Sequence, residues 1–215
     1  MFDVVPDLDH PAFTLYDTGA TSHNLGLVAT SPKHDAKTIS LAIDRVASAI
    51  VRQHKGTERL LLLGIANGGV TFAARLHDRL KRAGLHPGVG TIDISFHRDD
   101  IGRNPIPKEF APTIIPHDVN GATVILVDDV LHSGRTVKAA LDELFDHGRP
   151  ASVELAVLVD RSGRLLPVAA TYTGIALVAG AGEKVKVRLD ATDSSRDTVK
   201  LEPATKPARP VAAKS

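Results

Sequence analysis

Short apolar runs alternate with segments that have one apolar helical face along the middle of the chain. A continuous apolar run is typical of a strand buried on both faces, whereas apolar residues spaced three and four apart indicate a helix packed on one side. The predicted elements, in chain order, are a helix at 39–53, a strand at 60–65, a helix at 70–83, strands at 90–96 and 123–127, a helix at 136–145, and strands at 153–159, 185–189 and 198–201. This alternation predicts an α/β fold, with a twisted, mainly parallel sheet between helices.

The two ends of the chain lack this pattern. Residues 1–37 have no sustained apolar period, and we interpret them as a leader that packs loosely or reaches a neighbouring subunit. Residues 202–215 contain three prolines and four alanines, which predicts a flexible tail. The intervening segment, 38–201, is expected to form one domain.

The composition excludes several classes of protein. The 215 residues are 43% hydrophobic and 24% charged, as in folded globular proteins. Cysteine is absent, so disulfides, thiolate zinc sites and a cysteine nucleophile are excluded. No apolar run approaches the length of a membrane span, and the acidic N-terminus lacks a basic signal-peptide start, so we expect a cytoplasmic protein. Lys plus Arg is 26 and Asp plus Glu is 25, and this balance requires neither nucleic acid nor membrane as a partner.

The segment 124–136 carries the clearest chemical signal. Four apolar residues lead directly into Asp128 and Asp129, and a short turn with Ser133 and Gly134 precedes a helix. Backbone N–H groups of such a turn and of the helix N-terminus can bind a phosphate. The carboxylates would repel that phosphate, so we expect them to bind sugar hydroxyls, Mg²⁺ or both. The pattern predicts a site for a phosphorylated sugar, although either short motif alone could simply end a strand or cap a helix.

The segment 96–116 is predicted to be a lid. Its 21 residues contain four prolines and no apolar period, and a loop this long inside a compact domain is usually functional. Arg98 and Arg103 are the basic residues that it could bring to a bound anion. We interpret His97 as lid surface. The ten histidines are never closer than nine residues apart, so no HxxxH-type zinc pair exists.

The segment 124–136 resembles the phosphoribosyl pyrophosphate (PRPP) signature of the type I phosphoribosyltransferases. Further segments resemble the PyrR family, which combines uracil phosphoribosyltransferase activity with regulation of pyrimidine genes by RNA binding. They are 96–100, 115–119, 146–150, 155–161, 166–167 and 172–174. The resemblance covers roughly 39–201, and it implies the type I phosphoribosyltransferase fold with a small hood formed by the late segments.

The resemblance also implies roles for individual residues. Asp128 and Asp129 would hold the ribose hydroxyls, directly or with Mg²⁺, and Arg98 would act from the lid. The other implied sets are His132, Ser133, Gly134, Arg135 and Thr136 around the 5′-phosphate, Ile65, Ala66, Asn67 and Gly68 against pyrophosphate, and Val159, Asp160 and Arg161 along the base pocket, with Asp160 near the metal-bound pyrophosphate. The implied reaction transfers phosphoribose from PRPP to uracil, giving UMP and pyrophosphate. A homo-oligomer, most simply a dimer, is expected. An enzymatically weak regulator, or an enzyme for another base, remains an alternative.

Two departures from the family pattern affect these expectations. Gly68 stands where the family usually has an arginine, and glycine cannot replace the bidentate bonds of a guanidinium to pyrophosphate. We therefore expect weaker use of PRPP, or another cation in that place. Asp44 and Ser48 stand where the family usually has a threonine and a histidine that contact RNA, and Asp44 would repel phosphate. RNA binding is disfavoured, although a basic patch could still form from Arg149, Arg161 and Arg164.

The run 184–188 alternates basic and apolar residues. We interpret it as an edge strand with a charged outer face, which needs no nucleic-acid partner.

Overall fold

The computed structural model describes residues 33–95, 97, 112–180 and 182–204, together with the backbone of two short strands near the N-terminus. The elements in chain order are β1 (Phe13–Thr14), β2 (Leu27–Ala29), β3 (Lys33–His34), α1 (Ala36–His54), β4 (Leu60–Ile65), α2 (Gly68–Arg82), β5 (Gly88–Ile92), β6 (Thr123–Leu131), α3 (Arg135–Asp146), β7 (Ser152–Arg161), β8 (Tyr172–Leu177), β9 (Glu183–Arg188), a 3₁₀ turn (Ser194–Arg196) and β10 (Thr198–Pro203). Every predicted helix and strand is present, so the α/β class is confirmed.

The main sheet is parallel except at one edge. Its strand order is β1-β2-β8-β7-β6-β4-β5, and only β1, which pairs with β2, runs antiparallel to its neighbour. The carboxyl ends of the parallel strands therefore meet at the same edge of the sheet, which is where ligands bind in folds of this kind.

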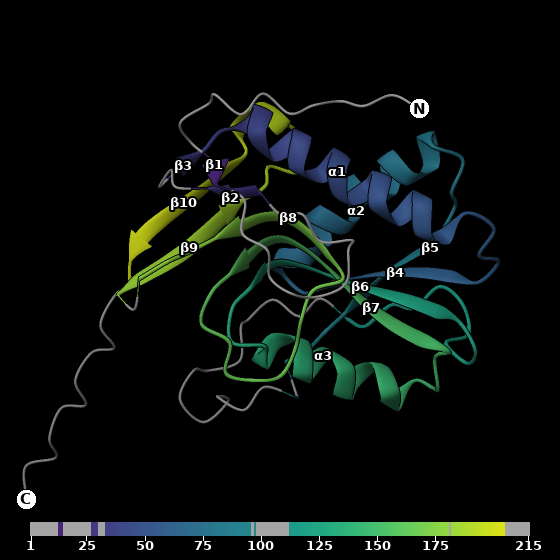
Figure 1. Ribbon diagram of the computed structural model, residues 1–215. Helices are drawn as coiled ribbons and strands as arrows, with labels where there is room; N and C mark the ends of the chain where they lie inside the picture. The colour runs from purple at the N-terminus through teal and green to yellow at the C-terminus, as the bar shows by residue number, and fades with distance from the viewer. Residues whose placement is uncertain are drawn as a thin grey trace, which may run out of the picture.

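Helices cover both faces of this sheet, with α1 and α2 on one side and α3 on the other (Figure 1). Successive strand residues point to opposite faces, and all six residues of β4 are buried. Leu60 and Leu62 pack with the apolar faces of α1 and α2, whereas Leu61 and Leu63 pack with α3. The continuous apolar runs in the sequence are thus explained by burial on both faces.

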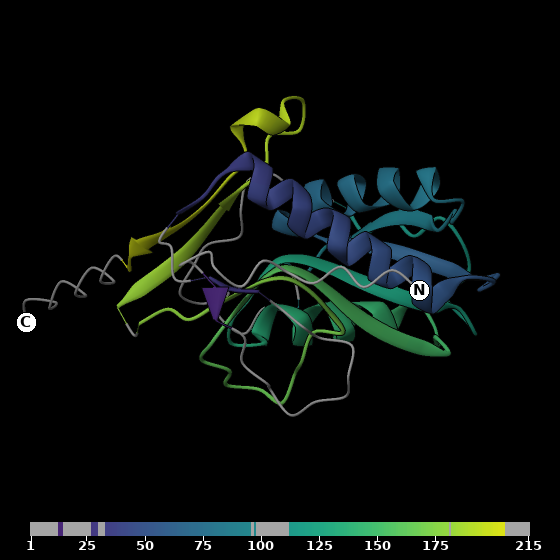
Figure 2. The same ribbon diagram turned by 45° about the horizontal axis from the view of Figure 1, so that its top comes forward.

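A second sheet forms the hood. Its strand order is β3-β10-β9, all antiparallel, and it projects from the main sheet beside the start of α1 (Figure 2). An ion pair fixes the hood segment to the core. Arg75 on α2 donates from both terminal nitrogens to Asp197, at 2.8 and 3.2 Å, and the side chain of Asp197 is only 2% exposed.

Several boundaries differ from the sequence prediction. Strands β1, β2 and β3 and the first residues of α1 fall within the expected leader 1–37, and β10 runs past residue 201 to Pro203. Strand β8 had no periodic signal, because threonine and glycine interrupt its apolar residues. Gly174 lies against the backbone of β7, where an added Cβ would be 2.7 Å from the carbonyl oxygen of Leu158. No helix in the described part of the chain is long and apolar enough to cross a membrane.

Candidate active site

Three neighbouring strands deliver the predicted site residues to one edge of the sheet. In the register of β4 and β6, Gly64 lies opposite Val127, and in that of β6 and β7, Leu131 lies opposite Asp160. The loop that follows β4, the acidic pair on β6 and the end of β7 are therefore side by side. The structure brings together the residues that the resemblance assigned to pyrophosphate, ribose and base.

Asp128 and Asp129 form a buried pair near the end of β6. Asp128 is 5% exposed, and its Oδ1 accepts the backbone N–H of Asp129 at 2.9 Å. Burial raises the pKa of Asp128 well above its usual value, and the charge of Asp129 raises it further. Burial also raises the pKa of Asp129, against the opposing effect of its backbone hydrogen bonds and of Lys184. No described residue forms an ion pair with either carboxylate, and the more distant charge of Lys184 compensates the burial of Asp129 only in part.

This unbalanced pair fits a divalent cation. Magnesium prefers carboxylate oxygens and commonly uses one or two protein carboxylates plus the phosphates of a substrate. A bound Mg²⁺ would compensate the burial of the two acids and lower both pKa values. Asp128 and Asp129 are thus the residues that would hold the metal, directly or through the substrate.

Backbone hydrogen bonds from the chain around residue 165 fix the loop between β6 and α3. Both Leu165 and Leu166 donate their backbone N–H groups to the carbonyl of Ser133, at 3.1 and 3.0 Å. Gly134 has a φ of 91°, a left-handed conformation that favours glycine, and α3 begins directly after it. The N-terminus of this 12-residue helix therefore opens beside the acidic pair, in the arrangement expected for binding a phosphate.

The loop after β4 lies against the acids because two glycines allow it. The Ala66–Asn67 peptide bond is cis, and α2 starts at Gly68. An added Cβ at Gly69 would lie 2.0 Å from the carbonyl oxygen of Val127. At Gly68 it would lie 2.5 Å from Cγ of Asp129. The glycine pair therefore serves close packing of α2 against β6, a role that the sequence alone did not reveal.

The end of β7 is held by an arginine network. Arg161 is buried, and its guanidinium contacts Nε2 of His132 at 3.0 Å and the carbonyl of Gly180 at 3.2 Å. A guanidinium only donates, so His132 accepts through Nε2 and carries its proton on Nδ1. Burial, then the charges of Arg161 and Arg164, lower the pKa of His132. Asp160 pairs with Arg164, which also donates to the carbonyl of His132 at 2.7 Å.

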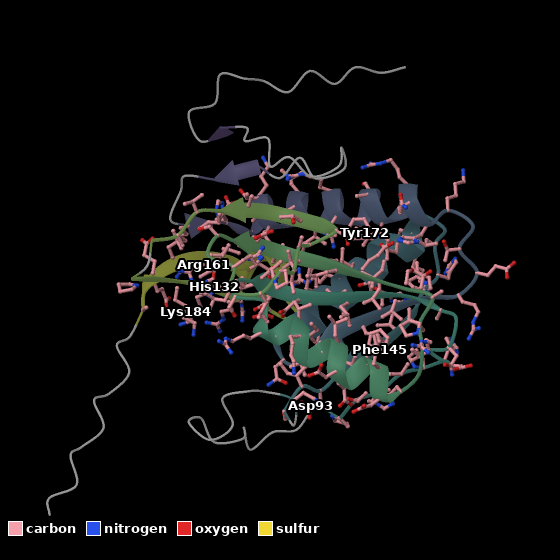
Figure 3. The ribbon with its side chains drawn as sticks, turned by 60° about the horizontal axis from the view of Figure 1, so that its bottom comes forward. Asp93, His132, Phe145, Arg161, Tyr172 and Lys184 are labelled. Atoms are coloured by element: carbon pink, nitrogen blue, oxygen red, sulfur yellow. The ribbon has the colours of Figure 1, made fainter. Side chains whose placement is uncertain are left out.

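A lysine from the hood completes this edge. Lys184 on β9 is close enough to Asp129 to lower its pKa, and Figure 3 shows Lys184 at the same end of the sheet as His132 and Arg161. The sequence could not reveal this proximity, because it arises only when β9 folds back over β6. The catalytic arginine expected from the lid, Arg98, lies outside the described residues, as do Arg103 and most of the predicted lid.

Comparisons with known proteins agree with this geometry. The family model described as the phosphoribosyl transferase domain matches residues 34–188, so the chain belongs to the phosphoribosyltransferase domain family. A solved structure of the hypoxanthine phosphoribosyltransferase of Trypanosoma cruzi is 26% identical, with a TM-score of 0.59, covering 79% of this chain and 94% of that one.

Curated relatives narrow this class. Proteins named "Bifunctional protein PyrR" from Listeria welshimeri and Streptomyces coelicolor are each 46% identical to this chain. The matches cover 77% and 83% of this chain, respectively, and 92% of each relative. Within the phosphoribosyltransferases, the chain is therefore a member of the PyrR family.

Proposed function

We propose that this protein transfers the phosphoribosyl group of PRPP to uracil, giving UMP and pyrophosphate. The observation that carries the proposal is the buried pair Asp128–Asp129 beside the N-terminus of α3, in a chain closely similar to PyrR proteins. An anion site next to two carboxylates suits a sugar phosphate, because phosphate and sugar hydroxyls need donors and acceptors, respectively.

Each part of the site has a role in this mechanism. The loop 132–136 and the start of α3 hold the 5′-phosphate and so fix the position of the ribose. Asp128 and Asp129 accept hydrogen bonds from the ribose hydroxyls. Mg²⁺, when bound, neutralises charge on the departing pyrophosphate. The end of β7, at residues 159–161, forms the wall for the base, and Asn67 and Gly68 face pyrophosphate.

No protein nucleophile is required. Pyrophosphate leaves C1 of the ribose as N1 of uracil attacks, and the residues act by positioning and by electrostatic stabilisation. The arginine that the family usually carries in the pyrophosphate loop is absent here. We infer that Lys184 supplies this charge, because β9 brings it to the same end of the sheet as His132 and Arg161 (Figure 3), where it lowers the pKa of Asp129.

The proposal is tested by measuring nucleotide formation from PRPP and Mg²⁺ with a panel of bases that includes uracil, hypoxanthine and guanine. We expect UMP from uracil and little product from the purines. Asp128→Asn and Asp129→Asn should each lower kcat/KM for PRPP by about 100-fold. Asp78→Asn, on an exposed carboxylate of α2, is the matched control and should have no effect. Near-normal activity of the Asp128→Asn, Asp129→Asn double variant would remove the proposed role of the acids.

We do not extend the proposal to RNA regulation. A groove of about 520 Å³ between α1 and α2 is lined by Asp44, Ser48, Arg52, Arg79 and Arg82, among others. Asp44 forms an ion pair with Arg79 in this groove and so reduces its positive charge. Of the three arginines that could have formed a basic patch, Arg161 and Arg164 both bind His132 at the end of β7, whereas Arg149 lies before the start of this strand. A gel shift with a pyrimidine leader RNA is expected to give no specific nanomolar complex.

The proposal includes a homo-oligomer in the cytoplasm. Large apolar side chains are exposed on α1 and α3, at Leu41 and Phe145, where a second copy could cover them. Light scattering coupled to size-exclusion chromatography should give at least twice the mass of one chain, and cell fractionation should recover the protein with the cytoplasmic enzymes.

A further inference from the structure

A cluster of metal-ligating side chains lies away from the candidate active site, at the C-terminal end of α3. Glu143 and Asp146 stand three residues apart on this helix, and the side chain of His97 approaches both. One ligand atom from each of the three residues lies within 4.8 Å of the others. Phe145, which Figure 3 labels on the same turn of α3, points away from the core and is exposed.

Hydrogen bonding accounts for only one of the two contacts of His97 with these acids. Nε2 of His97 lies 3.0 Å from Oε2 of Glu143 and 3.6 Å from Oδ2 of Asp146. One ring nitrogen carries at most one proton, and 3.6 Å is too long for a hydrogen bond, so Asp146 gains little from this contact. Two ligand atoms at zinc distances of about 2.0–2.1 Å in a tetrahedral site lie about 3.4 Å apart. The two observed separations lie on either side of that value.

The surroundings fix Glu143 in place. Its Oε1 accepts from the hydroxyl of Thr113 at 2.7 Å and contacts Nε2 of His147 at 3.1 Å, which leaves Oε2 to face His97. Thr113 in turn accepts the backbone N–H of Asp93 at 3.0 Å. Metal sites characteristically hold their ligands in this way, through hydrogen bonds from neighbouring groups.

We propose that His97, Glu143 and Asp146 bind a divalent transition-metal ion of the zinc class. An imidazole with two carboxylates favours zinc over magnesium, which prefers oxygen ligands alone. The ion joins α3 to the segment after β5, because His97 follows β5 and Glu143 lies on α3. Thr113 is linked to the same site, since its hydroxyl donates to the carboxylate of Glu143. The site is separate from Asp128 and Asp129, so it neither depends on the proposed transferase activity nor stands in for the magnesium of that reaction.

The proposal is tested by zinc binding to the untagged full-length protein, measured by equilibrium dialysis with elemental analysis. Co²⁺ is a spectroscopic probe of the same site. We expect one Zn²⁺ per chain, retained in the presence of millimolar Mg²⁺ and in the double variant Asp128→Asn, Asp129→Asn. His97→Ala and Asp146→Ala should each weaken zinc binding at least tenfold and remove the Co²⁺ spectrum. Asp146 is 71% exposed, so its replacement leaves the fold intact.

His86→Ala supplies the matched control, since this histidine is exposed and distant from α3 in the sequence. The control should bind zinc as the wild type does. The proposal is overturned if the wild type binds no zinc at micromolar concentration, or if His97→Ala and Asp146→Ala bind it as tightly as the wild type. Loss of binding in the Asp128→Asn, Asp129→Asn variant would place the ion in the active site instead.

Discussion

Replacing Gly68 with alanine should impair PRPP use without destabilising the fold. An added Cβ at Gly68 would lie 2.5 Å from Cγ of Asp129 and 2.6 Å from both carboxylate oxygens, whereas ordinary contact begins at 3.4 Å. The carboxylate must therefore move by about 0.9 Å. A misplacement of about 1 Å in a catalytic site can cost about 100-fold in rate, so we expect kcat/KM for PRPP to fall by that order.

The thermal stability of Gly68→Ala should not fall together with its activity. Gly68 is the first residue of α2, and alanine is a better helix former than glycine by up to about 1 kcal/mol. The Tm should therefore stay the same or rise slightly. Gly182→Ala is the matched control, because a Cβ at that position meets nothing within 4 Å. Steady-state UMP formation and thermal melts of both variants are the assays. If Gly68→Ala has the same kcat/KM for PRPP as Gly182→Ala, the inferred contact with Asp129 does not matter for activity.

The same contact changes how an arginine at this position must be tested. Gly68→Arg introduces the displacing Cβ together with the guanidinium that the family usually carries. Comparison with the wild type would mix the two effects, whereas comparison with Gly68→Ala isolates the guanidinium. Higher PRPP affinity in Gly68→Arg than in Gly68→Ala would support the idea that a cation is missing from the pyrophosphate loop.

Three further predictions concern buried and exposed charges of the protein. Burial and the charge of Asp129 raise the pKa of Asp128, so the ionised form of Asp128 destabilises the metal-free fold. Asp128→Asn should therefore raise the Tm at pH 8. The gain should disappear near pH 4, where the aspartate of the unfolded chain, with a pKa of about 3.9, also becomes protonated. Lys184→Ala should raise KM for PRPP several-fold. Lys186→Ala should leave KM unchanged, because the ammonium of Lys186 lies 3.5 Å from Glu202. Equal effects of the two substitutions would mean that Lys184 has no specific role. Arg75→Ala leaves Asp197 buried without its cation and should lower the free energy of unfolding in urea by about 3 kcal/mol. Replacing the exposed Arg82 with alanine should not change this free energy. A loss below about 1 kcal/mol in Arg75→Ala would show that the hood does not need this ion pair.

The parts of the fold that could be predicted depend on local sequence. The buried runs of β4, β6 and β7 are apolar throughout, so the sheet could be predicted from the sequence. The acids that follow the apolar part of β6 are adjacent in the chain, so the acidic pair could be predicted as well. Strand β6 itself continues through Asp128 and Asp129 to Leu131, because its pairing with β7 extends that far. The hydrophobic pattern alone predicts that this strand ends before the first charged residue, Asp128.

The parts that could not be predicted depend on contacts between distant segments. Lys184 lies close enough to Asp129 to lower its pKa only because the hood sheet folds back over β6. His97 meets Glu143 across 46 positions of sequence, and a search for closely spaced histidines cannot find such a pair. The packing of Gly69 against Val127 was likewise invisible, since the two glycines after β4 look the same as those of a flexible phosphate loop.

The short strand β2 has a consequence for how the protein is made. It pairs in parallel with β8 and so covers an edge that would otherwise present unpaired backbone groups. Strand β2 lies near the start of the chain, and β8 lies more than a hundred residues later. During synthesis the covering strand has therefore left the ribosome long before the edge that it covers. The nascent chain can close this edge as soon as β8 emerges, which limits the time during which another copy could add a strand there.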